Sequence, residues 1–391
     1  MREWRLRDDV VEKDYVLGWI LWGIGADAKL QRYWVFKGGT CLKKCYIETY
    51  RFSEDLDFTV LPGGPVAPED VERTLVAVLG RVAERSGLEL LGRSPRLRQR
   101  PNGSTEGRVY YRGPRNAPTA ASVKLDLTAD ESVVRPPVLR EIAHSHSDRL
   151  PSPATIRCYG FEELFAEKLR AMGERCRSRD LYDVINLFRR RDLRAHPRLI
   201  RDVLIKKCQT KEVPVPTMDL LEGSRHRAEV EAEWANMLAH QLPALPPFGH
   251  FWGELPSLFE WLDGTELPVW LPAIPLGSNE EPDWRPPAVA STWKGPASLE
   301  VVRFAAANHL CVRLGYGGKQ RLIEPYSLRR TKAGNLLLHA IRVEDREHRA
   351  YRVDRIESVR ASTRPFKPVH AVEFTPTGHL HSPPQRQPRR S

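Results

Sequence analysis

The chain has 391 residues, in which 61 Lys and Arg outnumber 50 Asp and Glu and give a formal net charge of +11. This length predicts two or three domains. The sequence has no apolar run long enough to span a bilayer and does not open on a signal segment, so we expect a cytoplasmic protein without membrane contact. The six cysteines lack zinc-binding spacing, which favours free thiols. The basic balance favours nucleic acid or a nucleotide as partner, although an ordinary basic surface is equally compatible.

Apolar periodicity predicts alternating helices and strands in the first two-thirds of the chain. In chain order, these are a helix over 5–28, a strand over 33–36, a helix over 40–48, a strand over 52–60, a helix over 71–86, strands over 109–112 and 122–127, and helices over 161–175, 180–190 and 222–240. Proline density then changes the pattern, because the prolines between 264 and 296 forbid long helices. A compact unit follows, with a helix over 299–308 and strands over 310–316, 321–325, 335–341 and 350–353.

These elements predict an α+β protein with several parts. We place an α+β core at 1–160, a helical domain that completes its site at 161–263, a proline-rich linker at 264–296, a small β-unit at 297–375 and a disordered basic tail at 376–391.

An acidic pair and a glycine turn carry the first chemical signal. Asp55 and Asp57 are two apart on a predicted strand, so their carboxylates share one face and suit Mg²⁺. Gly38 and Gly39 let backbone N–H groups approach an anion, and Thr40 can cap the following helix or bond a phosphate oxygen. A phosphate site beside a metal-binding carboxylate pair predicts nucleotidyl transfer.

Asp126 and Lys124 share one face of a further predicted strand. Asp126 is a candidate third metal ligand, or the base for the attacking hydroxyl. The alternative is a charge pair on an edge strand, which local sequence favours equally.

Charged residues on two predicted helices are more ambiguous. Glu163 and Glu167 lie four apart, and Asp180 and Asp183 lie three apart. Spacing alone favours helix caps and surface ion pairs. The alternative assigns Lys168 to a triphosphate and Asp180 to orienting Lys168 or Arg179.

Together these residues resemble the AbiEii/AbiGii toxin family of polymerase-beta-like nucleotidyltransferases. The resemblance runs from about 8 to 262 and rests on four motifs: Lys37-Gly38-Gly39-Thr40, the run from Arg51 to Phe58, the run from Glu163 to Lys168, and Arg179-Asp180-Leu181-Tyr182-Asp183. It implies a toxin of a type IV toxin–antitoxin or abortive-infection system. The implied partner is a DNA-binding antitoxin that forms no stable complex with it. Several relatives modify the acceptor end of tRNA and so block translation.

The resemblance also implies roles for single residues. Catalytic roles fall to Asp55, Asp57, Lys168 and Asp180, with Asp183 as the competitor for the last. Metal ligands are Asp55, Asp57 and Asp126. The nucleotide-binding set is Gly38, Gly39, Thr40, Ser53, Lys124 and Arg179. The implied reaction is in-line attack of an acceptor hydroxyl on the α-phosphorus of a nucleoside triphosphate.

The C-terminal unit resembles the WYL domain, an Sm-like barrel that often senses ligands. Leu336-Leu337-Leu338 stands where that domain has its Trp-Tyr-Leu run. Tyr316, Arg352 and Arg355 are its candidate contacts to phosphate. The alternative is that the two arginines pair with Glu324 or Asp354.

The sequence therefore predicts a Mg²⁺-dependent nucleotidyltransferase toxin acting on the tRNA acceptor end. Two alternatives stay open: nucleotidylation of a protein, and a non-catalytic regulatory protein that binds nucleotide or nucleic acid. The nucleoside triphosphate used is not specified. A group of basic residues is expected to attract the RNA backbone, namely Arg93, Arg96, Arg98, Arg100, Lys206 and Lys207.

Overall fold

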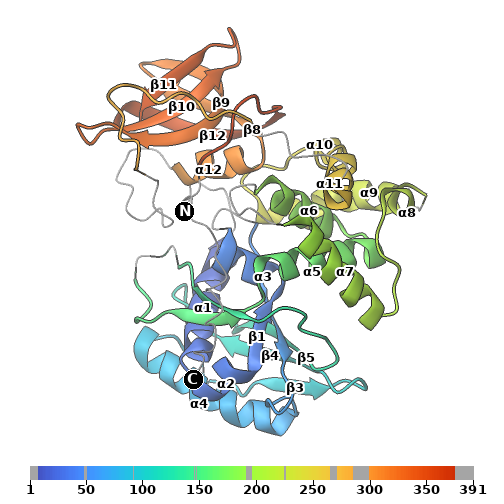
Figure 1. Cartoon of the computed structure of the whole chain (residues 1–391). Coiled ribbons are helices and arrows are strands. Elements are labelled where there is room, and N and C mark those ends of the chain that lie inside the picture. Colours follow the sequence, from blue (N-terminus) through green and yellow to red (C-terminus); the bar gives the residue numbers. More distant parts are fainter. Residues whose placement is uncertain are drawn as a thin grey trace, which may run out of the picture.

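The computed structural model describes residues 8–47, 51–90, 92–144, 146, 148–190, 196–223, 226–264, 271–284 and 299–374. The predicted tail at 376–391 and the start of the first predicted helix lie outside these residues, as does much of the predicted linker. Figure 1 shows three parts: a sheet with its helices, a group of helices beside it, and a second sheet at the far end.

The N-terminal part is built on a mixed sheet of seven strands in the order β3-β4-β5-β2-β1-β7-β6. Its strands are β1 (Trp34–Lys37), β2 (Asp55–Val60), β3 (Arg96–Gln99), β4 (Thr105–Tyr111), β5 (Ala121–Thr128), β6 (Val138–Glu141) and β7 (Thr155–Cys158). Strand β2 runs antiparallel to β1 and parallel to β5, so both predicted acidic strands lie side by side in the middle of the sheet.

Helices α1 (Asp8–Gly25) and α4 (Pro68–Ser86) pack in one apolar core with the sheet. Proline at its start and Gly87 in the left-handed conformation at its end define the limits of α4. Alternation on β2 and β5 sends Leu56 and Leu125 into this core. The acidic residues between them therefore point to the other face. Short helix α2 (Ala28–Tyr33) leads into β1.

The helical part follows β7. Its elements are α5 (Phe161–Arg175), α6 (Ser178–Arg189), α7 (Pro197–Thr210), α8 (Met218–Glu222), α9 (His226–Leu238), α10 (Phe248–Trp252) and α11 (Leu255–Asp263). The helix predicted over 222–240 is divided, since α8 ends at Glu222 and α9 begins at His226. No helix in the described ranges combines the length and apolarity needed to cross a bilayer.

The C-terminal part contains α12 (Leu299–Ala307) and an antiparallel sheet in the order β11-β10-β9-β8-β12. Its strands are β8 (Leu310–Tyr316), β9 (Lys319–Arg330), β10 (Leu336–Arg342), β11 (His348–Arg352) and β12 (Ile356–Pro365). The rings of Tyr316 on β8 and Tyr351 on β11 lie 5.2 Å apart although two strands separate β8 from β11, so the sheet is strongly curved. Within the described strands no β11–β12 pairing closes a barrel.

Gly25 gives a test of how α1 packs on the sheet. A Cβ at this position would lie 2.0 Å from the backbone carbonyl oxygen of Thr155, which cannot move without displacing β7. We expect Gly25→Ala to lower the free energy of unfolding by about 1–3 kcal/mol, the usual cost of overpacking. Urea unfolding measures this loss.

Gly249→Ala is the matched control, because nothing lies within 4 Å of a Cβ there and the residue sits in α10. Alanine should leave stability unchanged or raise it slightly. Equal unfolding midpoints for Gly25→Ala and the parent would contradict the packing.

Candidate functional site

The turn between β1 and α3 (Gly38–Cys41) lies directly against the acidic strand. Gly38 has φ +80°, and a Cβ on it would be 2.3 Å from Oδ2 of Asp57. A Cβ on Gly39 would be 2.9 Å from Nη2 of Arg51 and 3.0 Å from Oγ of Ser53. Glycine is therefore required at Gly38 by its positive φ and close approach, Gly39 is tightly packed against side chains, and the structure brings Ser53 and Asp57 to the predicted turn.

Strand register brings the predicted carboxylates onto one face. Asp57 is the direct partner of Asp126, and Asp55 is the direct partner of Lys124. Partners on adjacent strands point to the same side, so Asp55, Asp57 and Asp126 share the face opposite the apolar core. Strand β5 lies between β4 and β2, so Asp126 is not on an edge strand.

The charge around Asp57 fits a cation. Burial, together with the charges of Asp55 and Asp126, raises the pKa of Asp57 to about 6 against the opposing effect of Lys37 and Lys168. Hard oxygen donors with excess negative charge are the donor set that Mg²⁺ prefers. Asp55 and Asp57 would hold such an ion.

Asp126 already has cationic partners. Arg100 Nη2 lies 3.0 Å from Asp126 Oδ2 and 2.7 Å from Glu106, and Lys124 Nζ lies 3.7 Å from Asp126. The charge pair considered from sequence is therefore present, although on an interior strand.

Thr40 has a structural contact. Its hydroxyl donates to the backbone carbonyl of Asp55 at 2.5 Å, and its side chain is fully buried. This bond fixes the start of β2 against the glycine turn.

A buried ion cluster joins the helices to the acidic strand. Arg51 donates to both carboxylate oxygens of Asp183, at 2.8 Å from Nε and 3.0 Å from Nη2. Lys168 Nζ lies 2.8 Å from Asp183 and 3.8 Å from Asp180. Asp180 instead accepts two hydrogen bonds from Arg175, at 2.9 and 3.1 Å. The second sequence motif contains Arg51, but residue spacing alone does not indicate its contact with Asp183.

Arg179 lies beside the same cluster. Burial and the charge of Arg51 lower the pKa of Arg179, while Asp55 and Glu54 oppose this shift. Its Nε is buried and has no hydrogen-bond partner among the described residues. The residue therefore lies close to the acidic strand, with a donor that is not engaged.

Surface ion pairs were the expectation for Glu163 and Asp183, and that interpretation is wrong. Both side chains are 0% exposed. Glu163 accepts the backbone N–H groups of Val134 and Arg135 at 2.8 Å, and Lys207 lies 3.1 Å away. Lys207 is 2% exposed, so it does not belong to a basic RNA-attracting surface either. These side chains are buried because separate helices pack over them, and the spacing of residues within one helix does not reveal that burial.

The C-terminal candidates are partly engaged in the structure. Arg352 forms a bidentate pair with Asp354, at 3.0 and 2.7 Å, which is the ion pair that the sequence offered as an alternative to phosphate binding. Glu324 pairs with Arg346. Tyr316 packs edge-on against Tyr351, and Arg355 lies in the short turn before β12.

A glycine turn beside paired carboxylates, with the charge of the buried Lys168 acting on Asp57, is an arrangement that would suit nucleotidyl transfer. A family model for the nucleotidyl transferase AbiEii toxin of type IV toxin–antitoxin systems matches residues 19–263, and a WYL domain model matches residues 297–361. The chain belongs to the AbiEii nucleotidyltransferase toxin family and carries a C-terminal WYL domain.

Solved structures of similar proteins are more distant. MenT4, a nucleotidyltransferase toxin from Mycobacterium tuberculosis H37Rv, has 19% identity and a TM-score of 0.47, over 68% of this chain and 89% of that one. JHP933 from Helicobacter pylori has 18% identity and a TM-score of 0.36, over 66% and 99%. No curated protein matches the chain.

Asp183 and Asp180 can be separated by their effect on stability. Asp183→Asn removes the bidentate partner of Arg51 and leaves Lys168 only the more distant Asp180, so we expect a loss of about 3–5 kcal/mol in the free energy of unfolding. Asp180→Asn should cost less, because the side chain of its main partner Arg175 is 48% exposed and can be solvated. Equal losses would contradict this order.

The position of Asp183 beside Arg51 and Lys168 predicts that the stability of the fold depends on pH. Burial would raise the pKa of Asp183, but Arg51 and Lys168 lower it to about 2, below its ordinary 3.8. A carboxylate with a lowered pKa stabilises the fold above pH 4 and loses that contribution as pH falls toward 2. Thermal unfolding across this window should show a smaller pH dependence in Asp183→Asn than in Asp180→Asn. Parallel curves would contradict the assignment.

Proposed function

We propose that this protein is a Mg²⁺-dependent nucleotidyltransferase toxin that transfers a nucleotide from a nucleoside triphosphate to the acceptor end of tRNA and thereby blocks translation. The observation that carries the proposal is the close approach of the Gly38 turn to Asp57, with Asp55 on the same strand face. Phosphate-binding backbone and metal-binding carboxylates thus lie in one place.

Each residue has a distinct part in the proposed reaction. Asp55 and Asp57 would hold Mg²⁺, which would neutralise charge on the triphosphate. The backbone at Gly38 and Gly39 and the hydroxyl of Ser53 bind phosphate oxygens. Asp126 is the third acidic group, held beside the pair by Arg100. The acceptor hydroxyl attacks the α-phosphorus in line, and pyrophosphate leaves.

Lys168 stabilises charge that develops on the phosphates. Its 2.8 Å contact with Asp183 holds its ammonium in position, so we assign the orienting role to Asp183 and a supporting role to Asp180. The charge of Lys168 acts on Asp57 and lowers its pKa, which supports a role for Lys168 near the proposed metal ligands. Arg179, near Asp55, is a second phosphate contact.

A row of cations across the sheet supports an RNA acceptor. Register places Asp55 beside Lys124, Lys124 beside Arg108, and Arg108 beside Arg96, so the four side chains share one face. Arg96 and Arg108 are exposed. Successive cations that end at a metal-binding carboxylate suit a phosphate backbone whose end enters the site.

The partner of the toxin, under this proposal, is a DNA-binding antitoxin that does not form a stable complex with it.

The WYL domain adds a nucleotide- or nucleic-acid-binding surface at Tyr316 and Arg355. Arg352 can join this surface only where a phosphate displaces Asp354.

Removing the paired carboxylates tests the reaction. We expect Asp55→Asn and Asp57→Asn to lower transfer of labelled nucleotide to total tRNA by at least about 100-fold, because charge stabilisation at the phosphates is lost. Asp70→Asn on α4 is the matched control and should transfer like the parent. Each labelled triphosphate is tested with Mg²⁺ and with a chelator, and the label is assigned by nuclease and protease digestion.

Label that survives nuclease but not protease would replace the tRNA acceptor with a protein one. Undiminished transfer by both variants would contradict the metal assignment. The absence of transfer by the parent with every triphosphate would favour a regulatory, non-catalytic protein.

The row of cations predicts a salt effect on RNA binding. Arg96→Glu with Arg108→Glu should weaken tRNA binding and reduce the slope of log K against log salt by roughly 1.4–1.8, for two lost phosphate contacts. Arg73→Glu with Arg85→Glu, both exposed on α4, is the charge-matched control. Fluorescence anisotropy over a salt series measures the slope, and equal slopes for the two double variants would contradict the RNA path.

A further inference from the structure

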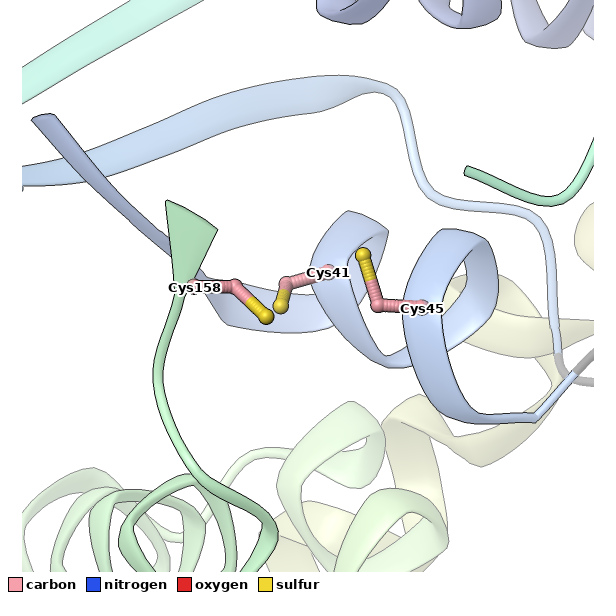
Figure 2. Close-up of side chains that lie close together, drawn as sticks. All are labelled: Cys41, Cys45 and Cys158. Carbon is pink, nitrogen blue, oxygen red and sulfur yellow. The ribbon is translucent and has the colours of Figure 1, made fainter. Parts of the chain in front are cut away.

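Three of the six cysteines converge at one buried point. The sulfur atoms of Cys41, Cys45 and Cys158 all lie within 4.8 Å of one another, and Figure 2 shows two of them on the helix after the glycine turn and the third across from it. Their exposed fractions are 0%, 6% and 0%. All three thiols are free.

The fold explains this convergence. Cys41 ends α3, and Cys45 lies four residues on, in the π-helical turn Leu42–Tyr46, so both face the same side. Cys158 is the last residue of β7 and the register partner of Phe36 on β1. Because β1 leads directly into the glycine turn, the end of β7 lies beside the start of the helix.

The sulfur separations suit a metal ion. A metal–sulfur bond of about 2.3 Å in a trigonal arrangement places sulfurs about 4 Å apart, within the limit observed here. In the described residues no histidine or carboxylate joins the three sulfurs. Thiolates bind zinc and soft ions such as Cu(I), but structural zinc almost always takes four ligands, so a set of three thiolates suits Cu(I) better.

Neighbouring groups offset the charge of such a site. Arg140 donates from Nε to the carbonyl of Cys45 at 3.2 Å, and its guanidinium lies over the ring of Tyr46 at 4.9 Å. The Tyr46 hydroxyl lies 3.8 Å from the sulfur of Cys158. The Tyr46 hydroxyl donates to the carbonyl of Tyr159 at 2.6 Å, so Arg140 is the neighbouring group that lowers the cost of burying thiolates.

We propose that Cys41, Cys45 and Cys158 form a three-thiolate site for one soft, thiophilic metal ion of the Cu(I) class. Binding replaces the three thiol protons, which pass to solvent, with one ion, and no electron is transferred. The ion enters the site past Cys45, which is the least buried of the three cysteines. The ion cross-links α3 to β7 directly behind the nucleotide-binding turn, and the site is separate from the proposed Mg²⁺ ligands.

Cu(I) binding by the full chain tests the proposal. The protein is titrated with Cu(I) without oxygen, against a coloured Cu(I) chelator as competitor. We expect one equivalent per chain, with a sulfur-to-copper charge-transfer band in the ultraviolet. Cys45→Ala and Cys158→Ala should bind more than roughly tenfold more weakly. Cys208→Ala, which removes a buried thiol outside the cluster, is the matched control and should bind like the parent.

X-ray absorption on the copper-loaded parent gives a readout that does not depend on the folding of any variant. Three sulfur neighbours support the site, and two or fewer overturn it. Equal weakening in Cys208→Ala and Cys158→Ala overturns the assignment of residues. Retention of Zn²⁺ but not Cu(I) overturns the class of ion. None of these readouts depends on nucleotide transfer, so the site can fail while the proposed enzyme activity stands.

Discussion

The buried carboxylate of Asp183 is the contact on which the arrangement of the site depends. It accepts two hydrogen bonds from Arg51, which lies on the segment leading to the acidic strand, and a third contact from Lys168 on α5. Arg51 also donates to Gln241 at 3.1 Å, beyond the end of α9. One charge cluster therefore fixes the acidic strand, the lysine and the helical part relative to one another. Because two cations share one fully buried carboxylate, its loss removes the bidentate partner of Arg51 and leaves Lys168 only the more distant Asp180, which is costly.

The two sides of the site have opposite charge balance. On the sheet, Asp57 lies near Asp55 and Asp126, and this excess of negative charge helps burial to raise its pKa. On the helices, Arg51, Lys168 and Arg179 gather around Asp183 and Asp55. A triphosphate with a divalent cation would suit such a pair of surfaces, because the ion would face the carboxylates and the phosphates would face the cations. The charge balance of the folded protein thus favours the substrate class that the family assignment names.

Local patterns were sufficient for part of this description. The alternation of Asp55 and Asp57 with Leu56 and Phe58 predicted one acidic face, and the glycine pair predicted the turn. Long-range packing decided the rest. Four-residue β7 has too little periodicity to be predicted, yet it brings Cys158 beside Cys41. Spacing could not tell that Asp183 rather than Asp180 lies nearer Lys168, nor that Lys207 is buried by Glu163, since both contacts depend on how separate helices meet.

A crystal structure with Mn²⁺ and a non-hydrolysable nucleoside triphosphate analogue, with manganese located by its anomalous signal, would test the central claim most directly. The account predicts manganese bound by Asp55 and Asp57, with the phosphates against the Gly38–Gly39 turn and within reach of Lys168. Manganese or phosphates bound elsewhere, with these carboxylates unliganded, would contradict it.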